Sequence, residues 1–302
     1  MDCQSTKEQC DQKINSLSLD DVLTINPFKK TAYSQDEHYI AGMGVLRESM
    51  EDRKCPKHFL WNHCMLLVRP DAFFLGHPHN IVDAFHARNL NIVGCKIIHI
   101  NHAQADSLWW YQRNVMTSER RELLRELLAS APSVLLLIRD ENPRNSGPAT
   151  AHLTHLKGPS IARKRKPRHL RSIVAPATAN VLSYLHASDD PADAVREMYL
   201  LLGADRMSDM LKHAQSKVFL NRFVVSYAHM QVKALLSRQE EICRSDATNG
   251  KFGVSTMGWE TFLERAKCCI DYVSGESYDP YEATIPDGKD LVMALDEYLR
   301  IL

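Results

Sequence analysis

Three short apolar runs, separated by stretches with helical spacing, most constrain what this 302-residue chain can fold into. The runs cover residues 63–68, 91–98 and 134–138, and each has the length of a buried strand. Pro70 ends the first run, because proline cannot continue a ladder of backbone hydrogen bonds. Residues 104–130 carry leucines and charges at helical spacing, which predicts a crossover helix between the second and third strands. The pattern indicates an α/β or α+β core.

The two flanks of this core differ in character. Residues 1–60 show no sustained period, with Pro27 and Pro56 interpreted as breaks, and are expected to form an N-terminal extension. A helix is predicted from Asp190-Pro191, an aspartate cap followed by proline at the first helical position, to Gly203. The domain division is therefore an extension over 1–60, a core over 61–204 and a helical region over 205–302. Within the last region, residues 207–242 are expected to pack internally, with a partner-binding arm as the weaker alternative.

Composition excludes several protein classes. Hydrophobic residues make up 44% and charged residues 25%, with 37 basic against 37 acidic side chains, as in ordinary globular proteins. This balance argues against nucleic acid as the main partner. The eight cysteines form no C-x-x-C pair, so reduced thiols in a cytoplasmic protein are expected. Residues 1–13 do not resemble a signal peptide, and no apolar run is long enough to span a membrane, so no membrane partner is expected.

Residues 142–188 contain no aspartate or glutamate but carry eight basic side chains. These are Arg144, Lys157, Arg163, Lys164, Arg165, Lys166, Arg168 and Arg171. Concentrated guanidinium groups favour phosphate binding, whereas a solvated loop is the plainer alternative. Neither a P-loop nor a dinucleotide-binding fingerprint is present, so side chains would have to hold the phosphate.

Other conspicuous residues are interpreted as structural. Two pairs of histidines lack a convincing third metal ligand and are read as ordinary histidines: His77 with His79, and His152 with His155. The Trp109-Trp110 pair is attributed to helix packing.

An ordered set of motifs over about residues 61–204 resembles the nucleoside diphosphate kinase family. The first, Arg69-Pro70-Asp71, is similar to the family's Lys-Pro-Asp after its first strand. Residues 166–171 resemble the family's Lys-Pro-Gly-Thr-Ile-Arg segment, and residues 186–189 resemble its His-Gly-Ser-Asp, with Glu197 at the spacing of the family's glutamate. The resemblance implies an α+β fold with a ferredoxin-like antiparallel sheet and helices packed on it.

The resemblance also implies a chemistry. An imidazole attacks the γ-phosphate of a nucleoside triphosphate, and the phosphohistidine passes the group to a nucleoside diphosphate or related acceptor in a ping-pong reaction. His186 would be the nucleophile, oriented by Ser188 and Glu197. The expected substrate- and phosphate-binding residues are Arg69, Tyr111, Lys157, Arg171 and Ser183. Mg²⁺ is the expected cofactor, bound through nucleotide phosphates with Asp189 as a candidate ligand, and family members commonly form homo-oligomers.

This chain departs from the family's pattern at several positions. Arg69 replaces a lysine, Ser183 replaces an asparagine, and no arginine stands near His152 where the family has a second phosphate-binding arginine. These departures concern nucleotide recognition more than the histidine. A catalytically inactive nucleotide-binding or scaffold module is therefore the alternative to an ATP-dependent kinase, and the sequence names neither the acceptor nor the base.

Overall fold

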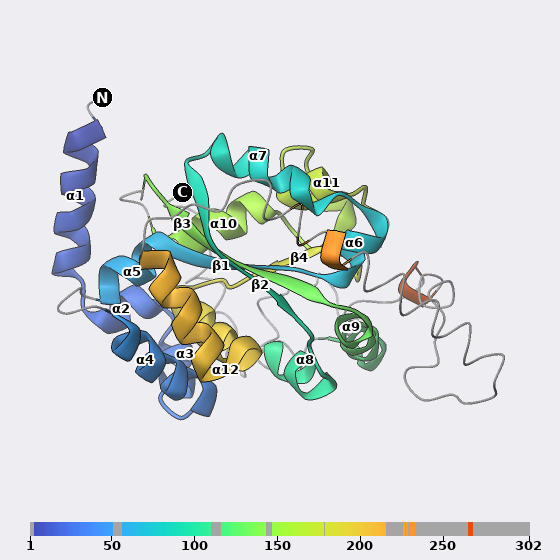
Figure 1. The fold of residues 1–302 in the computed structure, drawn as a ribbon, viewed down its shortest axis with the longest axis horizontal. Coiled ribbons are helices and arrows are strands. Elements are labelled where there is room, and N and C mark those ends of the chain that lie inside the picture. The colour runs from blue at the N-terminus through green and yellow to red at the C-terminus, as the bar shows by residue number, and fades with distance from the viewer. Residues whose placement is uncertain are drawn as a thin grey trace.

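The protein is described here by a computed structural model over residues 3–50, 56–109, 116–142, 147–177 and 179–215, with residues 226, 228, 230–232 and 265–267 (Figure 1). Most of the region expected to be helical over 205–302 lies outside these residues, as does Tyr111.

In the part of the chain that the structure describes, four strands form one antiparallel sheet in the order β2-β3-β1-β4. They are β1 (His63–Val68), β2 (Leu90–Ile98), β3 (Ser133–Asp140) and β4 (Leu185–Ala187). Leu66 lies opposite Leu136 in the centre of the sheet, and Leu67 lies opposite His186 at its edge. This strand order is ferredoxin-like, so the fold class that the resemblance implied is confirmed, and the sequence's α/β alternative is excluded.

Both faces of the sheet are covered, which explains why its strands are continuous apolar runs rather than alternating ones. Because side chains alternate along a strand, Leu66 and Val68 of β1 enter one core, while Met65 and Leu67 enter the other. All four are essentially inaccessible to solvent.

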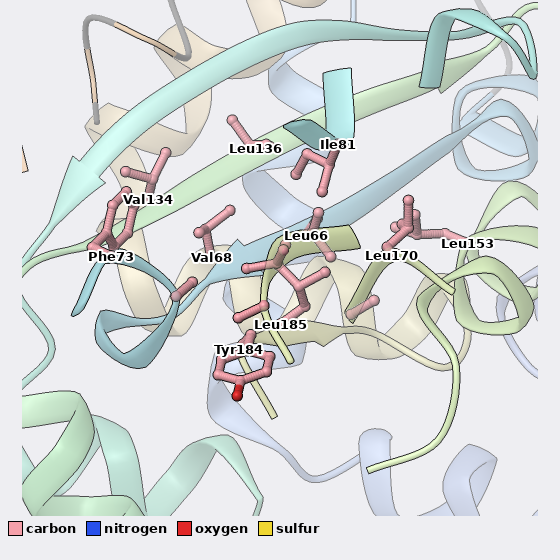
Figure 2. Close-up of a cluster of buried hydrophobic side chains, with 14 of the residues drawn as sticks. Leu66, Val68, Phe73, Ile81, Val134, Leu136, Leu153, Leu170, Tyr184 and Leu185 are labelled. Atoms are coloured by element: carbon pink, nitrogen blue, oxygen red, sulfur yellow. The ribbon is translucent and has the colours of Figure 1, made fainter. Parts of the chain in front are cut away.

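Helices cover the first face, and Figure 2 shows their side chains meeting Leu66 and Val68. The elements that contribute to this core are α6 (Pro70–Leu75), α7 (Ile81–His86), α9 (Ser118–Ser130), α10 (Ala149–Lys157) and α11 (Leu170–Val174). Short 3-10 turns lie at η1 (Pro78–Asn80) and η3 (Ala162–Lys164). The single crossover helix predicted over 104–130 is in fact two helices, α8 (His102–Leu108) and α9.

The second face packs against α12 (Pro191–Gln215), α8 and N-terminal helices (Figure 1). The N-terminal helices are α1 (Cys3–Ser16), α2 (Leu19–Leu23), α3 (Pro27–Tyr33), α4 (Glu37–Ser49) and α5 (Pro56–Asn62). Pro27 and Pro56 lie at breaks between helices, as interpreted, but each is also the first residue of the helix that follows. Asn26 caps α3 by accepting hydrogen bonds from two backbone N–H groups.

Helix α12 begins and breaks where the sequence predicts. The Oδ1 of Asp190 accepts from the backbone N–H of Asp193 at 2.9 Å, capping the first turn. Gly203 has φ 71°, a left-handed conformation that favours glycine, and it kinks the helix. Beyond the kink, Met207 and Met210 are buried, as expected for internal packing. None of the helices among the described residues is long and apolar enough to cross a membrane.

Candidate active site

His186 is the middle residue of the short edge strand β4. Its neighbours Leu185 and Ala187 are buried in the core of the first face. The alternation of side chains along β4 therefore turns the imidazole toward the other face, where α12 carries Glu197. The imidazole is 14% exposed, so it is shielded but reachable.

The two ring nitrogens of His186 have different partners. Nε2 lies 2.9 Å from Oε2 of Glu197, and the Ser188 hydroxyl donates to the same oxygen at 2.6 Å. The indole N–H of Trp109 donates to Nδ1 at 3.3 Å. An indole N–H can only donate, so Nδ1 must be an acceptor and Nε2 must carry the proton of the neutral ring. The structure thus brings His186, Ser188 and Glu197 together, with a lone pair on Nδ1.

Trp109 is a site residue that sequence analysis missed. It is the C-cap of α8, and its indole meets the imidazole edge-to-face, with ring centroids 5.4 Å apart and an interplanar angle of 84°. Its interpretation as helix packing is therefore incomplete. The tandem tryptophans gave no signal to separate a packing role from this contact. The supporting aromatic was expected at Tyr111, which lies outside the described residues.

Arg69 lies inside the protein, with hydrogen-bond partners from its own chain. Its guanidinium donates to both carboxylate oxygens of Asp71 at 3.1 Å, to the Ser183 hydroxyl at 2.7 Å and to the carbonyl of Val181 at 2.8 Å. The residue is 2% exposed, and burial lowers its pKa. Four of the five guanidinium N–H groups therefore have internal acceptors, which leaves one for the phosphate contact expected of Arg69.

Arg171 and Lys157 hold the backbone on either side of His186. β4 is at the edge of the described sheet, so its outer carbonyls need other donors. Arg171 Nη2 donates to the carbonyl of Leu185 at 2.8 Å, and Lys157 Nζ donates to that of Ala187 at 3.1 Å. Two cations therefore bracket the histidine.

These two cations are buried with little compensating negative charge. Burial, with the charges of Arg165 and Arg69, lowers the pKa of Arg171 to about 9. Burial lowers the pKa of Lys157 to about 8 despite Asp189, whose Oδ1 is 3.9 Å away. Both groups stay charged at neutral pH, so the site retains positive charge for an anion.

The described residues contain no group of three side chains able to hold a metal ion. The side chain of Asp189 is 27% exposed and offers one carboxylate. Such a donor set fits Mg²⁺ only when nucleotide phosphates and water supply most ligands, which is a mode that Mg²⁺ commonly adopts.

The basic side chains of the acid-free segment 142–188 are exposed in part. Four of its side chains face solvent: Arg163, Lys164, Lys166 and Arg168. Arg165 instead stacks 5.4 Å from the ring centroid of Tyr184 and donates to three backbone carbonyls. His152, at the position near the family's missing arginine, pairs with Asp140 at 2.9 Å and is buried.

Comparison with known proteins matches the region that carries this site to one family. The sequence model of the family described as nucleoside diphosphate kinase matches residues 62–207. The nucleoside diphosphate kinase of Thermococcus kodakarensis is 26% identical over 165 residues, covering 51% of this chain and 88% of the relative. That of Pelotomaculum thermopropionicum is 26% identical over 144 residues, covering 48% and 89%.

Two solved structures are similar at lower identity. The Aquifex aeolicus nucleoside diphosphate kinase has a TM-score of 0.39 and 23% identity, covering 46% of this chain and 93% of its own. A halophilic nucleoside diphosphate kinase from Halobacterium salinarum in complex with CDP has a TM-score of 0.40 and 20% identity, covering 48% and 89%.

Residues 62–207 thus form an α+β domain of the nucleotide phosphotransferase type. This domain, about half of the chain, matches the nucleoside diphosphate kinase family.

Proposed function

We propose that the protein transfers the γ-phosphate of a nucleoside triphosphate through a phosphohistidine at His186 to a nucleoside diphosphate or a related acceptor. The observation that carries the proposal is the hydrogen bonding of the ring, which fixes the proton on Nε2 and leaves the lone pair on Nδ1. A neutral imidazole with one oriented lone pair is the nucleophile that this reaction needs.

The reaction has two half-steps. In the first, Nδ1 forms a bond to the γ-phosphorus, the bond from that phosphorus to the β,γ-bridging oxygen breaks, and the nucleoside diphosphate leaves with the electron pair. In the second, an acceptor phosphate oxygen attacks the same phosphorus and Nδ1 leaves. Glu197 stabilises the positive charge that develops on the ring while Nε2 keeps its proton.

The charges around His186 support a phosphoryl group rather than a neutral substrate. Arg171 and Lys157 donate hydrogen bonds to the backbone carbonyls of the residues just before and just after His186. Their positive charge favours the anionic transition state. Mg²⁺ bound to the nucleotide phosphates would neutralise part of the remaining charge, with Asp189 as the protein carboxylate available to it. The cytoplasm expected from the cysteine pattern supplies both nucleotides.

The Trp109 contact describes a resting state. The indole N–H occupies the lone pair of Nδ1, so this bond has to break before Nδ1 attacks phosphorus. At 3.3 Å the bond is longer than a typical N–H donor distance, which makes the exchange inexpensive.

A second candidate function is nucleotide binding without turnover. Its support is Arg69, whose guanidinium is committed to Asp71 and Ser183 and leaves one fewer cation for the transition state. Under this alternative, a nucleotide would bind without forming a phosphoprotein.

The distinguishing experiment is incubation with γ-labelled ATP and Mg²⁺, followed by a panel of nucleoside diphosphates. We expect an acid-labile, base-stable label in the wild type and in His86→Gln, a control that changes an exposed histidine on α7. We expect no label in His186→Gln. Equal label in all three proteins would refute the proposal, and tight nucleotide binding without label would favour the second function.

A further inference from the structure

Arg196 lies on α12 directly before Glu197 and contacts two other elements. Its Nε donates to Oδ2 of Asp36 at 2.7 Å, and its Nη1 donates to the backbone carbonyl of Ser107 at 3.0 Å. The side chains of Arg196 and Asp36 are 4% and 8% exposed. The contacts are therefore shielded, and weak solvent screening makes them stronger than a surface ion pair.

These contacts lie next to both side chains that hydrogen-bond the His186 ring. Glu197, the partner of Nε2, is the next residue on α12. Ser107 lies on α8 two residues before Trp109, the partner of Nδ1. A single guanidinium thus fixes α8 to α12 close to the two side chains that orient the imidazole, and its planar fork suits two acceptors in different directions.

Asp36 comes from outside the family domain, which covers 62–207. It caps α4, because its Oδ1 accepts from the backbone N–H of Tyr39 at 2.9 Å while Oδ2 accepts from Arg196. Helix α4 packs closely along α12. A Cβ added to Gly42 would lie 2.9 Å from the carbonyl oxygen of Val195, so only glycine permits this approach.

We propose that Asp36 and Arg196 are positioning residues of the phosphotransfer site, through which the N-terminal helices set the orientation of His186. Neither side chain contacts the imidazole; each acts through Glu197 and Trp109. The inference rests on the proposed function and adds to it that residues outside the family domain tune the nucleophile. Displacement of a reacting group by ~1 Å can cost ~100-fold in rate, so small shifts of α8 against α12 matter.

The test uses Asp36→Asn in the full chain, with Glu37→Gln as the matched control. Asparagine caps a helix as well as aspartate does, so the substitution removes the charge that holds Arg196 and keeps the α4 cap. Glu37 is the exposed neighbouring residue. We expect the kcat for phosphoprotein formation from ATP to fall ~10-fold in Asp36→Asn, with KM and the urea midpoint close to those of Glu37→Gln.

A spectroscopic readout separates this inference from the proposed function. The ¹⁵N resonances of the His186 ring report its tautomer and hydrogen bonds without turnover. We expect one Nε2–H tautomer in the wild type and a mixture in Asp36→Asn and in Arg196→Lys, whose ammonium cannot reach both acceptors. Ring signals and kcat identical to wild type in both variants would overturn the inference. If the wild type takes up no phosphate but the two variants show these changes in the His186 ring signals, the proposed function alone would be refuted.

Discussion

Replacement of Lys29 by methionine tests how the N-terminal helices are held on α12. Lys29 reaches from α3 into the first turn of α12, where Nζ lies 2.9 Å from Oδ2 of Asp190 and 2.5 Å from Oδ2 of Asp193. The Tyr33 hydroxyl donates to the other oxygen of Asp193. All three charged side chains are at most 10% exposed.

The three groups of this cluster have pKa values shifted in different directions. Burial and the charge of Asp193 raise the pKa of Asp190 from 3.8 to about 7. Burial opposes the ionised form of Asp193 as well, but Lys29 and Tyr33 hold the pKa of Asp193 below its ordinary value. Burial also opposes the charge on Lys29, but the two carboxylates raise its pKa well above the ordinary value. Lys29 is therefore the group that permits two buried carboxylates.

The magnitude follows from the loss of that cation. Breaking a buried ion pair by removing one partner costs ~3–5 kcal/mol, because a charge is left uncompensated. Methionine has nearly the length of lysine, so the loss reports charge rather than volume.

The pH dependence has a definite sign. A raised pKa in the folded state means that the contribution of Asp190 to wild-type stability is present below about pH 4 and is lost as the pH rises through about 7. In Lys29→Met the pKa of Asp190 rises further and the pKa of Asp193 is no longer held down by the lysine, so the protein is penalised most when both carboxylates are ionised. The free energy of unfolding should fall by ~3–5 kcal/mol at pH 8 and by clearly less at pH 5.

Urea unfolding at the two pH values measures this effect. Lys30→Met is the matched control, because Lys30 follows on the same helix and makes only an exposed ion pair with Asp21, which is worth at most ~1 kcal/mol. A loss below ~1 kcal/mol in Lys29→Met, or an equal loss at both pH values, would show that Lys29 does not compensate the two buried carboxylates.

Three further predictions concern the site itself. Ser188→Ala removes one donor to Glu197 and should slow phosphoprotein formation ~10- to 100-fold in a rapid-quench assay; an unchanged rate would show that this hydrogen bond does not orient the carboxylate. Trp109→Phe keeps a ring but removes the N–H donor to His186, so we expect a changed Nδ1 resonance, whereas an unaltered spectrum would contradict the contact. Arg171 donates to the backbone carbonyls of Ser183, Gly158 and Leu185, and Arg171→Lys leaves at least one of them without its charged donor. We expect the free energy of unfolding in urea to fall by ~2–3 kcal/mol. A loss below ~0.5 kcal/mol would show that these hydrogen bonds do not stabilise the fold.

Strands β1, β2 and β3 and the start of α12 could be predicted because their signals are local, whereas the three-residue strand β4 was not predicted. The apolar runs, Pro70 and the Asp190-Pro191 pair act on their own backbone, and the structure follows them. The N-terminal helices were missed because they are mostly short and are stabilised by caps and packing rather than by a long apolar period. Asn26-Pro27 is a cap followed by proline at the first helical position, and it was the available signal.

Some residues of the candidate site could likewise be identified from the sequence, and others could not. Ser188 and Glu197 lie close to His186 in sequence, and the family resemblance suggested that they lie beside it, as they do in the structure. Arg69 could not be assigned, because its partner Ser183 lies 114 positions away and only the folded sheet brings them together. Trp109 is separated from His186 by 77 positions, and its contact likewise depends on the packing of α8 against the edge of the sheet.

The most direct test of the account is to identify the nitrogen that carries the phosphoryl group. Brief phosphorylation with ATP and Mg²⁺, followed by ³¹P and ¹⁵N NMR of the labelled protein, distinguishes the two phosphohistidine isomers. Because Glu197 retains the proton on Nε2, we predict phosphorus on Nδ1 of His186. Phosphorus on Nε2, or on any other residue of the chain, would contradict the account.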